Sequence, residues 1–190
     1  MGVVMAKKST RTKRAPARGK SKAPARPAAK KVSPVPPGYH TVTPYLTVND
    51  ATSALAFYKR AFGAREMMRM PAPNGKIGHA EIRIGDSHVM LCDEFPGTGA
   101  KSPTTLGGTT GSLMLYLPNV DAAFTRAVEA GCTSLMPPTD MFWGDRFGKL
   151  QDPYGNQWGI LTHKEDVPPR QMAERAKAAM AQMAQGQGNA

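Results

Sequence analysis

One arrangement of strands and helix occurs twice in this chain, and it restricts the possible folds more than any other feature. The first copy covers about residues 41–93 and the second about residues 112–163, and each reads as a strand, a helix and three strands. The copies share a pattern of apolar and polar positions rather than residue identity. The repeat therefore predicts an α+β fold of two paired, pseudo-symmetric βαβββ modules.

The first copy begins with Thr41–Val48, whose apolar and polar side chains alternate as in a strand with one buried face. Asn49 and Asp50 offer an N-cap for the helix that follows, and Gly63 stands where a left-handed residue would end it. Three further strands are expected at Arg65–Met70, Ile77–Ile84 and His88–Cys92.

The second copy follows a loop, Asp93–Thr110, that is rich in Gly, Pro and Thr. Asn119 is expected to cap its helix and Gly131 to close it. The strand that starts at Thr133 is expected to stop before Pro137, because proline has no amide hydrogen to donate. The other strands are expected at Leu113–Leu117, Phe147–Gln151 and Gln157–Thr162, and a last helix at Pro168–Gln185.

The N-terminal end differs from the two copies in composition. Residues 1–38 form a Lys/Ala/Pro/Arg-rich tail that holds 11 of the 25 basic residues and no acid, so the rest of the chain is formally neutral. With few large apolar side chains, the tail is expected to be disordered. It would either bind nucleic acid non-specifically through phosphates or serve without a defined partner. Its basic residues are Lys7, Lys8, Arg11, Lys13, Arg14, Arg18, Lys20, Lys22, Arg26, Lys30 and Lys31.

Several classes of protein are disfavoured by what the sequence lacks. No apolar run approaches the roughly 20 residues that span a bilayer, so no membrane partner is expected. The two cysteines, Cys92 and Cys132, lie far apart without metal-binding spacing, which favours a reduced cytoplasmic compartment. The motifs of serine hydrolases and of phosphate-binding loops are also missing.

Six short strings, in order along the chain, resemble the PhnB-like branch of the vicinal oxygen chelate (VOC) superfamily, which includes glyoxalases and bleomycin-resistance proteins. The resemblance covers about residues 41–166. It implies a VOC domain at 39–166, behind the tail at 1–38 and followed at 167–190 by a helix and a frayed end. The strings are Thr43–Asp50, Ala56–Gly63, His79–Asp86, Asp145–Gly148, Asp152–Gly155 leading into Trp158, and Thr162–Asp166.

The family fold implies that the two modules build a curved mixed sheet, with helices on the convex face and a ligand cup on the concave face. The resemblance also favours a homodimer, because many relatives build their cups across subunits. The ligand is expected to be a small organic molecule. Strand parity and the family motifs give the expected ligand-binding residues, which are Tyr45, His79, Glu81, Ser112, Met114, Trp143, Arg146 and Leu161.

Metal-dependent members of the superfamily hold a divalent ion with His, Gln or Glu on particular strands. The matching positions in this chain are Thr43, Ser112 and Gly159, and none of them is a good ligand for such an ion. No cofactor and no metal ligand are therefore expected. The alternative is a metal-dependent lyase or dioxygenase with atypical ligands, such as His79, Glu81 and water.

His79 and Glu81 lie two residues apart on one expected strand and so share a face. They are the candidate catalytic residues, as a general base and its partner, or else a polar pair that orders the sheet. Trp143 and Arg146 flank the expected cup mouth, where they would stack on a planar ligand or clamp an anion. The other interpretation is a turn in which Arg146 pairs with Asp145 over a core tryptophan. Whether the chain catalyses a reaction stays open.

Overall fold

The computed structural model of the 190-residue chain describes residue 2 and residues 32–186. The basic residues expected to form the tail, from Lys7 to Lys31, lie outside the described residues. Internal contacts divide the chain into Met1–Pro34 and Val35–Ala190, and the elements described below belong to the second unit.

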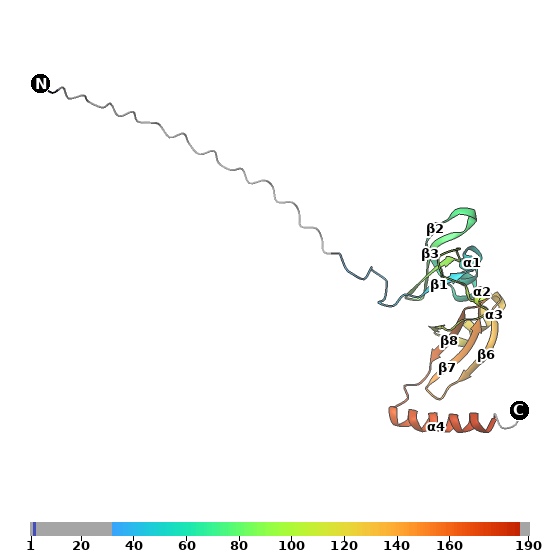
Figure 1. The fold of residues 1–190 in the computed structure, drawn as a ribbon. Coiled ribbons are helices and arrows are strands. Elements are labelled where there is room, and N and C mark those ends of the chain that lie inside the picture. Colours follow the sequence, from blue (N-terminus) through green and yellow to red (C-terminus); the bar gives the residue numbers. More distant parts are fainter. Residues whose placement is uncertain (1, 3–31, 187–190) are drawn as a thin grey trace. The chain divides into compact units, whose positions relative to one another are not determined.

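The first module contains one helix and a four-stranded sheet (Figure 1). The strands run in the spatial order β1-β4-β3-β2; β1 is parallel to β4, and the other neighbours are antiparallel. A single 3-10 turn, Pro73–Gly75, joins β2 to β3. The elements are β1 (Tyr45–Val48), α1 (Ala51–Phe62), β2 (Arg65–Pro71), β3 (Ile77–Ile84) and β4 (Ser87–Asp93).

The second module repeats this topology, with the order β5-β8-β7-β6 and a parallel pair formed by β5 and β8. The predicted repeat of two βαβββ modules is therefore confirmed. The elements are β5 (Ser112–Tyr116), α3 (Val120–Ala130), β6 (Thr133–Asp140), β7 (Asp145–Gln151) and β8 (Gln157–His163). A short helix, α2 (Pro103–Leu106), lies between the modules, and α4 (Pro169–Gly186) follows β8.

The same local devices start and end both long helices of the modules. Asp50 accepts a hydrogen bond from the Ser53 amide at 3.0 Å, and Asn119 accepts one from the Ala122 amide at 3.0 Å. Gly63 ends α1 with a φ of 68°, a left-handed conformation that glycine adopts without strain. The predicted caps are therefore confirmed.

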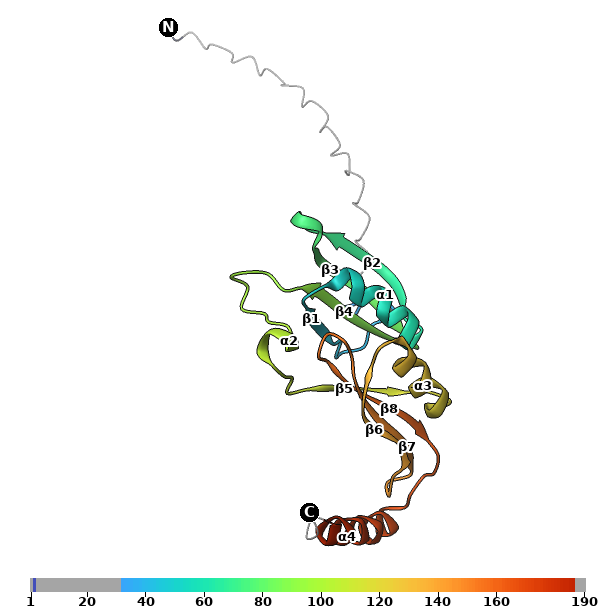
Figure 2. The same cartoon turned by 90° about the vertical axis from the view of Figure 1, so that its right-hand side faces the viewer.

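The core lies where the two helices meet the sheets. Helices α1 and α3 pack against each other across the module boundary, and Figure 2 shows them side by side. Phe62 of α1 packs on Trp158 of β8 with ring centroids 4.6 Å apart, and Tyr58 packs beside them. The expected apolar parity is confirmed, because Leu46, Val48, Ala80, Ile82, Trp158 and Ile160 are all buried.

Three expectations about local structure are wrong. The strand expected at Thr41–Val48 begins only at Tyr45. Strand β6 does not stop before Pro137 but continues through Pro137 and Pro138 to Asp140. It is an edge strand, where proline is tolerated, and its pairing with β7 shifts register between Met136 and Thr139. The Gly/Pro/Thr-rich loop also contains α2, whose first turn follows Ser102.

No helix among the described residues is both long and apolar enough to cross a bilayer.

Candidate functional site

The strand faces turned away from α1 and α3 carry the residues expected to form the cup. We call the first set the module 1 face (Tyr45, Met70, His79, Glu81 and Met90) and the second the module 2 face (Ser112, Met114, Tyr116, Phe147, Gly159 and Leu161). Strand pairing places each set on one side of its sheet. Both faces are open in this chain, because Tyr45, Met114 and Tyr116 expose 51%, 51% and 62% of their surface.

A chain of hydrogen bonds joins the polar side chains of the module 1 face. The Tyr45 hydroxyl lies 3.1 Å from Nδ1 of His79, and Nε2 of His79 lies 3.2 Å from Glu81. The second Glu81 carboxylate oxygen accepts a hydrogen bond from the Tyr39 hydroxyl. The predicted pair of His79 and Glu81 is thus in contact, and it is held from both sides by a tyrosine.

Tyr39 was not predicted to take part, and it reaches Glu81 from the segment that precedes β1. Its ring stacks on His88 with centroids 4.2 Å apart, and Nδ1 of His88 lies 2.8 Å from the Gly38 carbonyl oxygen. His88 itself is buried. No motif marks Tyr39, since only the fold brings it to Glu81, 42 residues away in sequence.

The hydrogen bonds set the charges of this network. The bond from Tyr39, more than the neighbouring His79, lowers the pKa of Glu81 below its ordinary value. The same bond raises the pKa of Tyr39. Near neutral pH the Glu81 carboxylate is therefore anionic and accepts hydrogen bonds from Tyr39 and His79. His79 lies between Glu81 and Tyr45. Such an arrangement can anchor a polar ligand group or accept a proton at His79.

On the module 2 face, Gly159 is at a position that matches a metal ligand of the family, and neighbouring side chains fill the space beside it. A Cβ at Gly159 would overlap the Met114 sulfur and would lie 2.7 Å from the Phe147 ring, so these two side chains fill that space. Thr43 and Ser112 offer only hydroxyls at the matching positions. Within the described part of the chain, no group of three or more His, Cys, Asp or Glu side chains is placed to hold a metal ion. The residues present do not fit a divalent metal.

A second polar network lies at one end of the module 2 face. Asp145 is only 4% exposed, and its carboxylate has three partners. Oδ2 accepts hydrogen bonds from the Tyr116 hydroxyl at 2.9 Å and from Nε1 of Trp143 at 3.1 Å. Oδ1 lies 2.8 Å from Nδ1 of His163, whose Nε2 lies 3.0 Å from Asp166. Trp143 is thereby fixed at this end of the face, next to Phe147.

Arg146 does not reach the module 2 face. Its side chain lies on the helix-covered side of β7, where it makes hydrogen bonds of 2.8–3.1 Å to Asp121 of α3 and one of 3.2 Å to Asp140. These two carboxylates occupy its guanidinium, so the expected anion clamp is not available there. The alternative turn pair with Asp145 is also absent, because Asp145 points to the opposite side and bonds His163.

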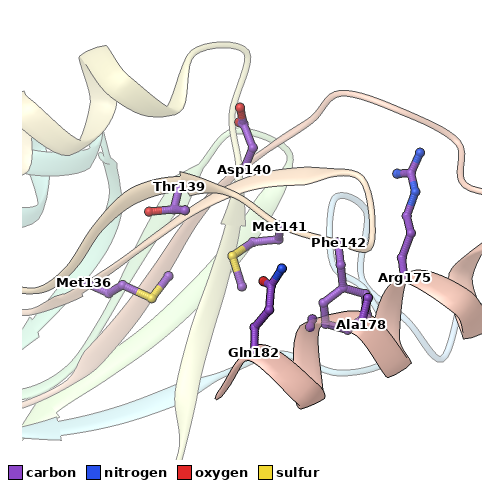
Figure 3. Close-up of a pocket in the computed structure, with 9 residues that line it drawn as sticks. Met136, Thr139, Asp140, Met141, Phe142, Arg175, Ala178 and Gln182 are labelled. Atoms are coloured by element: carbon purple, nitrogen blue, oxygen red, sulfur yellow. The ribbon is translucent and has the colours of Figure 1, made fainter. Parts of the chain in front are cut away.

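A further cavity lies elsewhere, between α4 and the β6–β7 hairpin (Figure 3). It has a volume of about 590 Å³ and a mainly apolar lining. Figure 3 shows Met141 and Gln182 pointing toward each other across it, whereas Asp140 points away. Arg175, on its rim, is held by Glu165 through two hydrogen bonds of 2.7 and 2.8 Å. The cavity borders the outer strand of module 2 and contains neither His79 nor Glu81.

Comparison with known proteins gives one matching family and several relatives. Residues 39–160 match the family described as the Glyoxalase/Bleomycin resistance protein/Dioxygenase superfamily. Protein Rv0887c of Mycobacterium tuberculosis is 44% identical over 122 residues, which are 63% of this chain and 72% of that protein.

Solved structures show the same architecture. TioX from Micromonospora sp. ML1 is 29% identical with a TM-score of 0.52, and the match covers 64% of this chain and 96% of TioX. A PhnB protein from Bacillus cereus is 20% identical with a TM-score of 0.51, covering 65% of this chain and 99% of that protein. At this identity the second likeness supports the fold alone.

Proposed function

Because the chain belongs to the Glyoxalase/Bleomycin resistance protein/Dioxygenase superfamily, we propose that it binds a small organic ligand on the module 1 and module 2 faces without a divalent metal. The observation that carries this proposal is the filled space at Gly159, which Met114 and Phe147 occupy in place of a ligating side chain. Ligand binding then depends on the side chains of the faces themselves.

The chemistry of the two faces supports a partly apolar, planar ligand with at least one polar group. Met70, Met90 and Met114 supply flexible, polarisable surface that adapts to irregular ligands. Tyr45, Tyr116 and Phe147 supply aromatic surface that can stack on a planar group. The polar anchor is the pair of His79 and Glu81, whose bonding partners already fix its orientation. Few but well-placed polar groups on an apolar surface are typical of small-molecule sites.

We further propose that two copies of the chain complete the cup, since each copy leaves both faces open. Free thiols at Cys92 and Cys132 are consistent with a reduced cytoplasmic setting.

The experiment that tests the metal-free proposal is elemental mass spectrometry on protein without residues 1–38, after incubation with Ni, Zn, Mn and Fe salts. Removing the tail excludes metal carried by bound nucleic acid. We expect far less than one metal per chain after desalting, with no difference between the wild type and Glu81→Ala. One metal per chain that is lost in Glu81→Ala would overturn the proposal and would support lyase or dioxygenase chemistry at His79 and Glu81.

A second candidate function rests on the location of charge. All 11 basic residues before position 32 lie in a segment without acids, whereas the rest of the chain is formally neutral. We propose that this tail holds nucleic acid through phosphate contacts, independent of base sequence. In gel-shift assays, full-length protein should lose affinity steeply as salt rises, and a variant without residues 1–38 should not bind. Equal binding by that variant would contradict the tail proposal.

A further inference from the structure

The string that begins at Asp145 and the string that ends at Asp166 have no part in the proposed ligand anchor, yet the fold joins them. Asp145 lies at the start of β7 and His163 at the end of β8, and the two are directly paired across these strands. Trp143 lies in the hairpin before β7, and Tyr116 ends β5. Three segments, β5, the β6–β7 hairpin and β8, therefore meet at one buried carboxylate.

Charge distinguishes the three partners of Asp145. Tyr116 and Trp143 donate as neutral groups, and His163 is the partner that can carry a positive charge. Burial disfavours the ionised form of a carboxylate that is 4% exposed, and a counter-charge beside it favours that form. Protonated His163 supplies this charge to Asp145 at 2.8 Å.

The groups around His163 all favour its protonated form. Asp145 faces Nδ1 from β7, and Asp166 faces Nε2 from the segment after β8. Glu165 is already paired with Arg175 of α4. Among the ion pairs of the described residues, Asp145 pairs with His163 and not with Lys164. Two carboxylates therefore act on one imidazole. The hydrogen bond to Asp145, and then that to Asp166, raises the pKa of His163 above its usual 6.5.

The loss of this proton has a defined geometric result. Neutral imidazole keeps one N–H, so it can still donate from Nδ1 to Asp145 but then presents a lone pair at Nε2. Nε2 and the Asp166 carboxylate would face each other as two acceptors, and their 3.0 Å contact would open. At the same time Asp145 would lose its counter-charge and would depend on the neutral donors Tyr116 and Trp143.

We propose that His163 is a positioning residue for Trp143: in its protonated form it bridges Asp145 and Asp166, and this bridge fixes the indole at the end of the module 2 face. Trp143 in turn contacts Phe147, one of the two side chains that fill the space at Gly159. The orientation of this aromatic surface is thereby tied to a single proton. That the surface meets a ligand rests on the proposed function, whereas the coupling of His163 to Trp143 does not.

The pH range in which the bridge forms follows from the pKa shifts of Asp145 and His163. Burial alone would raise the pKa of Asp145, but hydrogen bonds from His163, Tyr116 and Trp143 leave it below its usual value. The bridge is therefore present above the ordinary pKa of an aspartate and is lost as pH falls through the lowered one. For His163, whose pKa is raised, the bridge is complete below pH 6.5 and is lost as pH rises through the raised value.

The chain contains its own control for this effect. Trp158, the only other tryptophan, also donates its indole N–H to a buried carboxylate, Asp152, at 2.9 Å. The described partners of Asp152 are tyrosine, asparagine, tryptophan and backbone groups, and none of them is a histidine. Both indoles donate to a buried carboxylate, and only the carboxylate at Trp143 also bonds a histidine. Trp158 is fully buried, whereas Trp143 is half-buried.

The test is a ¹H–¹⁵N NMR titration of both indole groups in the full chain from pH 5 to 9, with Trp143→Phe to assign them. We expect the Trp143 signal to shift in one step with a midpoint above pH 6.5, identical to the midpoint of the His163 ring signals. The Trp158 signal should stay constant, and it also reports that each variant is folded. A Trp143 signal that stays constant while His163 titrates, or equal steps for both indoles, would overturn the proposal.

Substitutions separate positioning from a general loss of structure. His163→Gln should abolish the step at Trp143, and Asp166→Asn should lower its midpoint without abolishing it. His40→Gln, at an exposed histidine elsewhere, should change neither the step at Trp143 nor its midpoint. A step at Trp143 that persists in His163→Gln would assign the effect to another group and end the proposal. Because no ligand is used, failure here leaves the proposed binding function standing, and failure of the metal test leaves this coupling standing.

Discussion

Gly159 contributes no side chain to the module 2 face, so this face has no metal-ligating group at that position. Met114 and Phe147 fill the space that a side chain at position 159 would need. Gly108 is a useful comparison, because a Cβ there would meet nothing within 4 Å. The two glycines differ in the space around them.

We therefore expect Gly159→Ala to reduce the free energy of unfolding by about 1–3 kcal/mol, the usual cost of overpacking. The cost should be smaller in a Met114→Ala background, where the nearest obstructing atom has been removed. Urea denaturation of the four proteins of this cycle measures both values, and Gly108→Ala should leave stability unchanged. Equal costs in both backgrounds would show that Met114 does not fill the site.

The two cysteines should differ in reactivity. Burial raises the pKa of the Cys132 thiol to about 12, so almost no thiolate is present at pH 8. Cys92 is only partly buried. We expect a disulfide reagent at pH 8 to label one thiol per chain rapidly and the second only after unfolding. Cys92→Ser should remove the rapid phase, and a rapid phase lost in Cys132→Ser instead would contradict this assignment.

At the level of elements, the turn between β7 and β8 joins the two modules through Asp152. This buried carboxylate accepts hydrogen bonds from Tyr58 of α1 at 2.8 Å, from Trp158 of β8 at 2.9 Å and from the amides of Tyr154 and Asn156, both at 2.9 Å. A helix of the first module is thus tied to a turn of the second.

Asp152→Asn should reduce the free energy of unfolding by about 2–4 kcal/mol, because an amide turns a donor toward groups that are themselves donors. The matched control is Asp86→Asn, at a side chain that is 88% exposed, where the change should stay within about 0.5 kcal/mol. Guanidinium denaturation at fixed pH compares the two. Similar small effects at both sites would mean that Asp152 does not hold the modules together.

The elements that could be predicted from the sequence are those with local signals. Caps at Asp50 and Asn119 and the alternation within β3 depend on neighbours in the sequence, and they are found as expected. The continuation of β6 past Pro137 could not be predicted in this way. It depends on β6 being an edge strand, which is a property of the assembled sheet.

The same reasoning applies to the candidate site. His79 and Glu81 share a strand, so their contact follows from a separation of two residues. Tyr39 and His163 reach their carboxylates from other segments, so only the folded chain brings them there. Arg146 lies close to Trp143 in the sequence, and on that basis it was expected at the cup. Strand parity instead directs its side chain to the opposite side of β7, toward α3.

For the whole molecule, the open faces predict self-association. Large side chains on both faces are exposed, among them Met70 at 54% and Met114 at 51%. Apolar surface of this kind commonly marks a protein interface. A second copy, related by symmetry, would cover the module 1 face of one chain with the module 2 face of the other.

Sedimentation should therefore give twice the 20.4 kDa chain mass. The double variant Met70→Glu/Met114→Glu should sediment as a monomer, because charges would be buried without partners. Leu106→Glu, at an exposed position outside both faces, should remain dimeric. A wild-type protein that stays at the single-chain mass at the highest concentrations reached would refute the dimer.

The two prolines of β6 have a consequence for how copies of this chain can meet. An edge strand with free amides is a template on which another strand can add, and repeated addition leads to aggregates. Pro137 and Pro138 have no amide hydrogen to donate to an added strand, and the register shifts beside them, between Met136 and Thr139. Growth of the sheet by strand addition is therefore disfavoured at this edge, and we expect copies of the chain to associate through their faces, in a dimer that closes.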